Sequence, residues 1–114
     1  MVIVKMTTGA DTRTGLAERV RDALRVVVDP ELGVDVVSLG LVYEVRVDAA
    51  GRARIVFSLT SLGCPLGPLI ERDLVEAAER VEGVESVETE LVFVPPWSPD
   101  RMADEVKFAL GYLL

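Results

Sequence analysis

Alternating apolar and polar residues predict three strands in the chain. They span residues 41–48, 53–60 and 86–94, and each has one apolar side suited to burial. A short connection that contains Gly51 joins the first two strands, which predicts an antiparallel hairpin. Because a helix-like stretch precedes the third strand, we expect that strand to lie parallel to the second.

Apolar residues at intervals of three and four predict three helices, over residues 14–28, 66–81 and 99–110. Thr14 is a suitable cap for the first helix. That helix must end before the Asp29-Pro30 pair, because the residue that precedes a proline avoids the helical region.

The order of these elements predicts an α+β domain of two layers, α-β-β-α-β-α, with a small mixed sheet of three strands. Charged residues share one side of the strands, so the helices are expected to cover mainly the other face. This polar side carries Glu44, Arg46, Arg54, Glu88 and Glu90. The opposite side is expected to place Tyr43, Phe57 and Phe93 in the core. Residues 1–13 show no clear period and are expected to form a loosely ordered leader to a single domain over residues 14–114.

The composition of the chain argues against several classes of protein. The 114 residues include one cysteine and no apolar run long enough to span a membrane, so we expect a cytoplasmic domain that folds without a disulfide. A net charge of −7 and scattered arginines argue against nucleic acid as a partner. Without histidine, Cys-His and Ser-His-Asp catalysis are excluded, and we expect no enzyme. The absence of Asn and Gln favours a thermophilic source, although GC-rich codons give a similar skew.

The only cysteine, Cys64, lies where the strand-like run up to Thr60 gives way to the second helix. That helix begins with either Cys64 or Gly67 as its cap, and in the first case the helix dipole would stabilise a thiolate more strongly. An arbitrary single cysteine is more often a small buried apolar residue. The Gly63-Cys64-Pro65 setting between two elements favours a functional thiol. The hydroxyl of Thr60 is available to a ligand or to the loop backbone.

Three further side chains are candidates for a role in function or in structure. Asp29 is suited to cap the turn through Pro30 by accepting from the backbone N–H of Glu31 or Leu32, which leaves the Glu31 carboxylate without a local role. Trp97 is the only tryptophan, and it is either a plug of the core or an aromatic anchor for a partner.

Three motifs together resemble the MIP18 family, once called a domain of unknown function. They are Asp29-Pro30-Glu31-Leu32-Gly33 with the residues that follow to Tyr43, then Thr60-Ser61-Leu62-Gly63-Cys64-Pro65, then Pro95-Pro96-Trp97-Ser98-Pro99-Asp100-Arg101-Met102. The resemblance covers residues 16–102 and implies a domain similar to iron-sulfur cluster assembly domains, with SufT-like members that act in the maturation of iron-sulfur proteins. It implies a site formed by Asp29, Glu31, Thr60 and Cys64, supported by Pro30, Leu32, Gly63 and Pro65. Leu62 departs from the proline that many relatives carry there.

From this resemblance and the single thiol, we expect an accessory factor that delivers or inserts iron-sulfur clusters or targets client proteins. Cys64 would be a transient ligand or exchange point for a cluster or iron that is not stably bound. The partners would be the iron-sulfur assembly machinery or client apoproteins, and a homodimer or a client would supply the ligands that one thiol lacks. Two alternatives stay open, a metal-free adaptor for a metabolic enzyme complex and a redox-active thiol protein.

Overall fold

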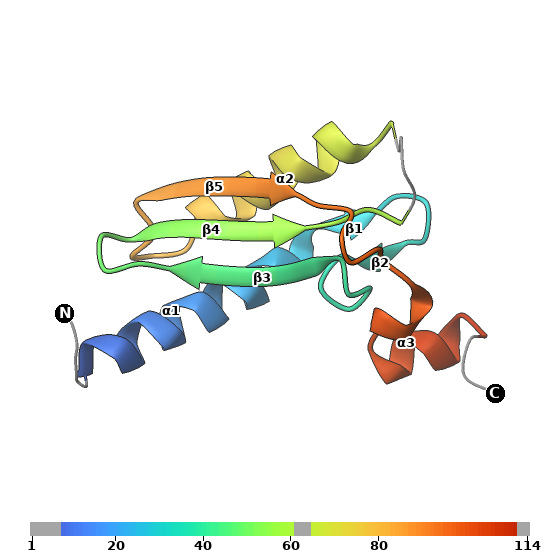
Figure 1. The fold of residues 1–114 in the computed structure, drawn as a ribbon, viewed down its shortest axis with the longest axis horizontal. Helices are drawn as coiled ribbons and strands as arrows, with labels where there is room; N and C mark the ends of the chain where they lie inside the picture. The colour runs from blue at the N-terminus through green and yellow to red at the C-terminus, as the bar shows by residue number, and fades with distance from the viewer. Residues whose placement is uncertain (1–7, 61–64, 112–114) are drawn as a thin grey trace.

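The computed structural model describes residues 8–60 and 65–111, with the backbone alone over residues 8–14. A three-stranded sheet forms one layer, and two long helices behind it form the other (Figure 1). The elements in chain order are α1 (Thr8–Ala23), the 3₁₀ turn η1 (Leu24–Val26), β1 (Val28–Asp29), β2 (Val34–Asp35), β3 (Val42–Val47), β4 (Arg52–Phe57), α2 (Gly67–Glu79), β5 (Ser86–Leu91), the 3₁₀ turn η2 (Pro99–Arg101) and α3 (Asp104–Ala109).

The sheet has the strand order β3-β4-β5. Strands β3 and β4 pair antiparallel through the predicted hairpin, and β5 pairs parallel to β4 after the crossover through α2. Both predictions of strand direction are therefore confirmed. The short strands β1 and β2 pair antiparallel in a separate sheet that the alternation pattern did not predict.

The core lies between the sheet and the two long helices, where α1 packs against β3 and α2 against β5. Its largest side chain, Phe57, is 1% exposed, and burial of a side chain of this size contributes about 1.5 to 3 kcal/mol. The open face carries ion pairs from Arg54 to Glu88 and Glu90, and from Arg46 to Glu44. The predicted coverage of one face by helices is confirmed.

Helix α1 begins at Thr8 and not at the expected cap, Thr14. Residues 8–13, assigned to a loose leader, therefore belong to the helix, while residues 1–7 lie outside the described part of the chain. The prediction depends on an apolar stripe, but a helix can continue for further turns without one. At the other end the helix tightens into η1 and stops before Val27, whose backbone is extended.

The single helix predicted over residues 99–110 is wrong, because the chain forms η2 and α3 with a break between them. At the break, Ala103 has an extended backbone, and its N–H donates to the carbonyl of Ser38 at 2.8 Å. Met102 and Val106 on either side of the break are both buried. A contact with a distant loop thus overrides the local helical pattern.

Tyr43 is not in the core, contrary to the prediction, because strand β3 has a register shift between Val42 and Glu44. A bulge of this kind changes which side chain faces inward, and Val42 is the one that is buried. The half-buried Tyr43 hydroxyl donates to the Pro95 carbonyl at 2.9 Å, and the Arg101 guanidinium lies 4.2 Å from the centre of its ring.

Residues 95–103, which we call the C-terminal clasp, fasten onto the loop that precedes β3. Trp97 packs against the core, and its indole Nε1–H donates to the Leu39 carbonyl at 2.7 Å. Gly40 has a φ of 77°, and an ideal Cβ there would meet the carbonyl carbon of Arg101 at 2.6 Å. These contacts fit the interpretation of Trp97 as a plug of the core, while its contact with a partner stays a prediction. In the described part of the chain, no helix combines the length and apolar character that a membrane crossing requires.

We expect Gly40→Ala to destabilise the fold more than Gly33→Ala. Gly33 has a similar φ of 70° but nothing within 4 Å of an added Cβ, so its substitution costs about 1 to 2 kcal/mol of backbone strain. At Gly40 the clash with the clasp adds to this strain, for a total of about 3 kcal/mol or more. Urea unfolding of the two variants measures the difference, and equal losses would contradict the close approach of the clasp.

Candidate functional site

Asp29 caps the turn between β1 and β2, as its sequence context predicts. Its side chain is 3% exposed, and Oδ1 accepts from the backbone N–H groups of Glu31 at 2.8 Å and Leu32 at 3.3 Å. The turn closes with a bond of 2.8 Å from the Gly33 N–H to the Asp29 carbonyl. The carboxylate of Asp29 therefore has a clear structural role in shaping the turn.

Glu31 stands at the exposed tip of the same turn, together with Pro30 and Leu32. Its own N–H is held by Asp29, which fixes the backbone from which the side chain projects. A carboxylate in this position is accessible to a partner or an ion from solvent. The turn thus exposes the Glu31 side chain, and the hydrogen bond to Asp29 fixes the backbone that carries it.

Thr60 lies three residues beyond the end of β4, where the alternation of that strand continues. Ile55, Phe57 and Leu59 are all buried, which places Ser58 and Thr60 on the opposite side of the chain. Thr60 is half-buried, and Ser58 is fully buried.

The turn that holds Asp29 and the end of β4 lie at the same end of the sheet (Figure 1). The loop over residues 36–41 connects them through three backbone hydrogen bonds. These run from Val36 N–H to the Val27 carbonyl at 2.9 Å, from Leu41 N–H to the Val36 carbonyl at 3.0 Å and from Ser58 N–H to the Leu41 carbonyl at 2.8 Å. The structure therefore brings Asp29, Glu31 and Thr60 to one end of the molecule.

Cys64 and Gly63 lie outside the described residues, so the prediction that Cys64 belongs to this site stays a prediction. Pro65, the first described residue after them, is exposed. Helix α2 begins at Gly67, with Leu66 as the N-cap residue. A helix start with Cys64 as the cap is therefore wrong, and the alternative cap, Gly67, is instead the first residue of the helix.

A pocket of about 290 Å³ lies beside this junction. It is lined by Phe57, Leu59, Gly67, Pro68, Glu71, Leu91 and Phe93. The pattern of α2 placed Glu71 on the outer side of the helix, but the carboxylate is half-buried and accepts from the Thr89 hydroxyl at 2.7 Å. The sequence signal for this contact was Thr89, a polar residue at an inward position of β5.

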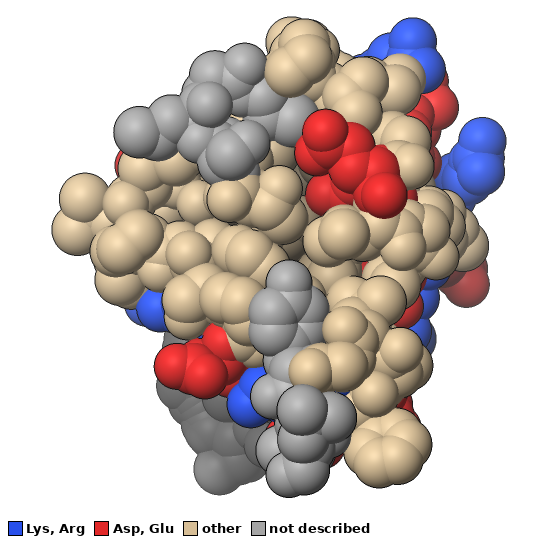
Figure 2. Space-filling view, turned by 90° about the vertical axis from the view of Figure 1, so that its right-hand side faces the viewer, with Lys and Arg blue, Asp and Glu red and all other residues tan. Residues whose placement is uncertain are grey.

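Figure 2 looks onto this end of the molecule, and uncharged residues make up most of the described surface in that view. Among the residues that the structure describes, no group of three or more His, Cys, Asp or Glu side chains is arranged to hold a metal ion.

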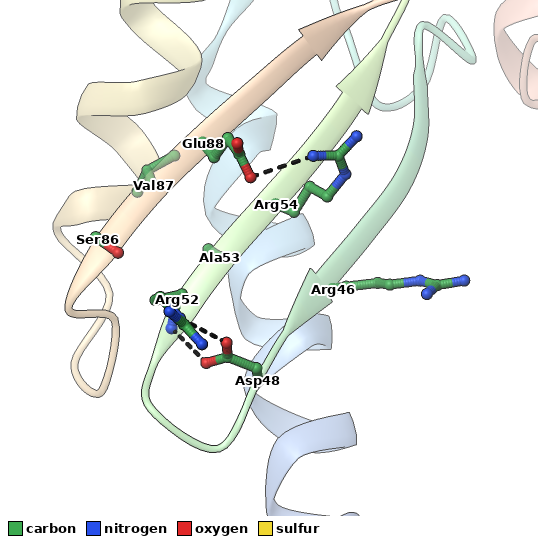
Figure 3. A pocket seen from close by; sticks show the side chains of 8 residues that line it. All are labelled: Arg46, Asp48, Arg52, Ala53, Arg54, Ser86, Val87 and Glu88. Atoms are coloured by element: carbon green, nitrogen blue, oxygen red, sulfur yellow. Dashed lines mark hydrogen bonds and ion pairs between the residues drawn. The ribbon is translucent and has the colours of Figure 1, made fainter.

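A hollow of about 540 Å³ lies elsewhere, on the open face of the sheet near the β3–β4 hairpin (Figure 3). Its lining includes Arg52, which pairs with Asp48 at 2.7 Å, and Arg54, which pairs with Glu88 at 3.2 Å. Both ion pairs are solvent-exposed, and their opposite charges neutralise one another within the hollow. We therefore do not assign the functional site to this hollow, and place it at the other end of the sheet.

Comparisons with known proteins agree with this architecture. A family model described as iron-sulfur cluster assembly protein matches residues 17–89. The chain is 47% identical over 96 residues to the Fe-S protein maturation auxiliary factor YitW of Bacillus subtilis, which covers 84% of this chain and 94% of the relative. It is 43% identical over 86 residues to the Fe-S protein maturation auxiliary factor SufT of Staphylococcus aureus, which covers 75% of this chain and 98% of the relative.

The fold is similar to that of a solved structure from Bacillus anthracis, described as a domain of unknown function, DUF59. The two share 40% sequence identity and superpose with a TM-score of 0.85 over 90% of this chain and 97% of the other. The predicted α+β fold class is confirmed.

We expect Asp48→Asn to lower stability at neutral pH but not in acid. The backbone N–H of Arg52, followed by its guanidinium, lowers the pKa of the Asp48 carboxyl below its ordinary value of 3.8. Because the pKa is lower in the folded state, the stabilisation is full above this ordinary value and disappears as the pH falls through the folded-state pKa. Urea unfolding over a pH series measures the gap from wild type, with Glu79→Gln on an exposed carboxylate as control. A gap that is independent of pH would contradict the role of the anion.

We expect substitutions of Asp29 to show whether the cap requires an acceptor oxygen or a negative charge. Asp29→Ala should lower the free energy of unfolding by about 0.5 to 2 kcal/mol, because two N–H groups lose their acceptor. Asp29→Asn keeps an acceptor oxygen and should unfold close to wild type. Chemical denaturation of both variants measures this difference. Equal losses for Asn and Ala would show that the cap requires the negative charge.

Proposed function

The chain belongs to the family of iron-sulfur cluster assembly proteins, and we propose that it is an accessory factor in the maturation of iron-sulfur proteins. Membership of the family confirms the resemblance carried by the three sequence motifs. The observation that carries the proposal is the gathering of Asp29, Glu31 and Thr60 at the end of the sheet from which the chain continues to Cys64.

We assign the cluster or iron as cargo, with Cys64 as its transient ligand or exchange point. A thiolate is the side-chain ligand that iron-sulfur clusters use most. One thiol leaves most positions of a cluster to other ligands, which a client's cysteines or a second copy of the chain would supply. A cluster that this chain ligates only in part is more readily transferred to another protein than stored on this one.

The two carboxylates of the turn have different parts in this proposal. Asp29 is buried and shapes the turn through two backbone N–H groups. Glu31 is exposed at the tip, where it can approach iron or the surface of a client. We assign Asp29 to positioning and Glu31 to contact with the cargo or the client.

The protein acts without being an enzyme in this proposal. The chain has no histidine, so the usual partner that activates a cysteine nucleophile is missing. The missing histidine supports a ligand role of the thiol over nucleophilic chemistry.

We expect Cys64→Ser to abolish the stimulation of client maturation. The test incubates the full chain anaerobically with ferrous iron, sulfide and an apoprotein that gains activity with its cluster. Ser86→Ala, an exposed hydroxyl at the opposite end of the sheet, is the control and should match wild type. Stimulation by Cys64→Ser equal to wild type would overturn the ligand role and favour a metal-free adaptor.

We expect Glu31→Gln to slow the same maturation while leaving stability within about 0.5 kcal/mol of wild type, because the side chain is exposed. Glu105→Gln, an exposed carboxylate of α3, is the matched control. Maturation rates of Glu31→Gln and Glu105→Gln that are both equal to wild type would exclude Glu31 from the site.

A further inference from the structure

Strand β5 is an edge of the sheet in the described part of the chain, since the strand order ends with it and it pairs only with β4 (Figure 1). Val92 N–H donates to the Phe57 carbonyl at 2.9 Å, so Val92 and every second residue before it direct their main-chain groups toward β4. The residues between them direct their N–H and C=O groups away from the sheet. These residues are Val87, Thr89 and Leu91. No described strand pairs with them on that side, so the edge can accept an added strand.

The pocket of about 290 Å³ lies beside the end of this edge, between β5 and the first turns of α2. Its apolar lining includes the buried Phe57 and Leu59 and the more accessible Leu91 and Phe93. Leu91 joins the two features, because it lines the pocket, is 40% exposed and carries outward main-chain groups. The volume is below the range of about 300 to 1,000 Å³ that is typical of small-molecule sites, and it suits one large side chain.

One charged group lines this apolar pocket, the half-buried carboxylate of Glu71. It accepts from the Thr89 hydroxyl at 2.7 Å, and among the described residues no Lys or Arg forms an ion pair with it. In contrast, Glu88 and Glu90 on the open face of β5 both pair with Arg54. A carboxylate that is partly withdrawn from water gains more from a cation than an exposed one, because the attraction is screened less.

The lining therefore favours a side chain with a long apolar stem and a cationic head. Lysine and arginine have this form, since the stem packs along apolar surface while the head keeps its charge. Arginine fits best, because its planar guanidinium can donate two parallel hydrogen bonds to one carboxylate. The net charge of −7 also attracts a basic partner. A strand added to β5 would direct every second side chain to the helix side of the sheet, where the pocket lies.

We propose that the β5 edge binds an extended segment of a partner protein, which pairs with the main chain of Val87, Thr89 and Leu91 and places an arginine or lysine side chain against Glu71. This inference goes beyond the proposed function and does not depend on the cluster or iron cargo. A second copy of the chain is a poor occupant. Antiparallel pairing of two β5 strands would bring Glu88 and Glu90 of one copy opposite those of the other, and like charges in that position are destabilising.

The first test measures the affinity of the full chain for a short capped peptide, with one central arginine between alternating threonine and valine residues, by isothermal titration calorimetry. Citrulline in place of the arginine keeps the shape of the side chain but removes its charge, and it should weaken binding about tenfold. Glu71→Gln should weaken binding of the arginine peptide to a similar extent, while its amide oxygen can still accept from Thr89. The two changes together should weaken binding little more than either alone, because they remove the same contact.

Glu76→Gln is the matched control, since it makes the same change of charge on α2 at an exposed residue that lies beside Val26 and Val27 and does not line the pocket. It should bind the arginine peptide as wild type does. Equal affinities of the arginine and citrulline peptides would overturn the proposal, and so would no binding of the arginine peptide at millimolar concentration.

The second test examines the pairing with the edge. Hydrogen exchange at the amides of Val87, Thr89 and Leu91 should slow when the arginine peptide binds. N-methylation of every second peptide residue should abolish binding in one of the two alternations and preserve it in the other, because only one side of an added strand faces β5. Binding without slower exchange at these amides would overturn the proposal. Their protection at high protein concentration without peptide would assign the edge to a second copy and would also overturn it. Maturation by Cys64→Ser tests the proposed function separately, because none of these binding measurements involves cargo.

Discussion

The loop over residues 36–41 is the part of the structure on which the other functional segments depend. Its backbone bonds to Val27 before the Asp29 turn, to Ser58 at the end of β4, and to Trp97 and Ala103 of the clasp. These three segments are the ones that carry the sequence motifs of the family. The loop uses only main-chain atoms in these bonds, so it requires no particular side chain of its own except at Gly40, where the clasp approaches too closely for a Cβ. Among its neighbours, Trp97 bonds through its side chain.

The sheet could be predicted from the sequence, since alternation over six or more residues is a strong local signal and the connections limit the strand directions. The departures have causes that are distant in the chain. The break before α3 follows from the bond between Ala103 and Ser38, and the outward position of Tyr43 follows from the bulge in β3. Neither cause leaves a mark in the local period of apolar residues.

The candidate site could likewise be predicted only where neighbouring residues determine it. Asp29 was recognised as a cap because the rule involves only neighbouring residues, and the structure confirms its bonds to Glu31 and Leu32. Glu71 and Ser58 were missed, because a helical pattern placed the first on the outside and a strand pattern placed the second on the polar face. Ser58 has no solvent exposure in the fold. Such burial can be found only when the fold is known.

The polar side chains of the candidate site differ in whether they make hydrogen bonds in the protein without cargo, and this difference fits the proposed transient binding. Asp29 accepts from two backbone N–H groups in the empty protein and can hold the turn in one shape, while the Glu31 side chain is exposed. A turn of fixed shape presents that carboxylate to cargo or client with little loss of backbone freedom on binding. In the proposed function, a single thiol would leave the remaining ligand positions to the receiving protein, so the client's additional cysteines would set the direction of transfer.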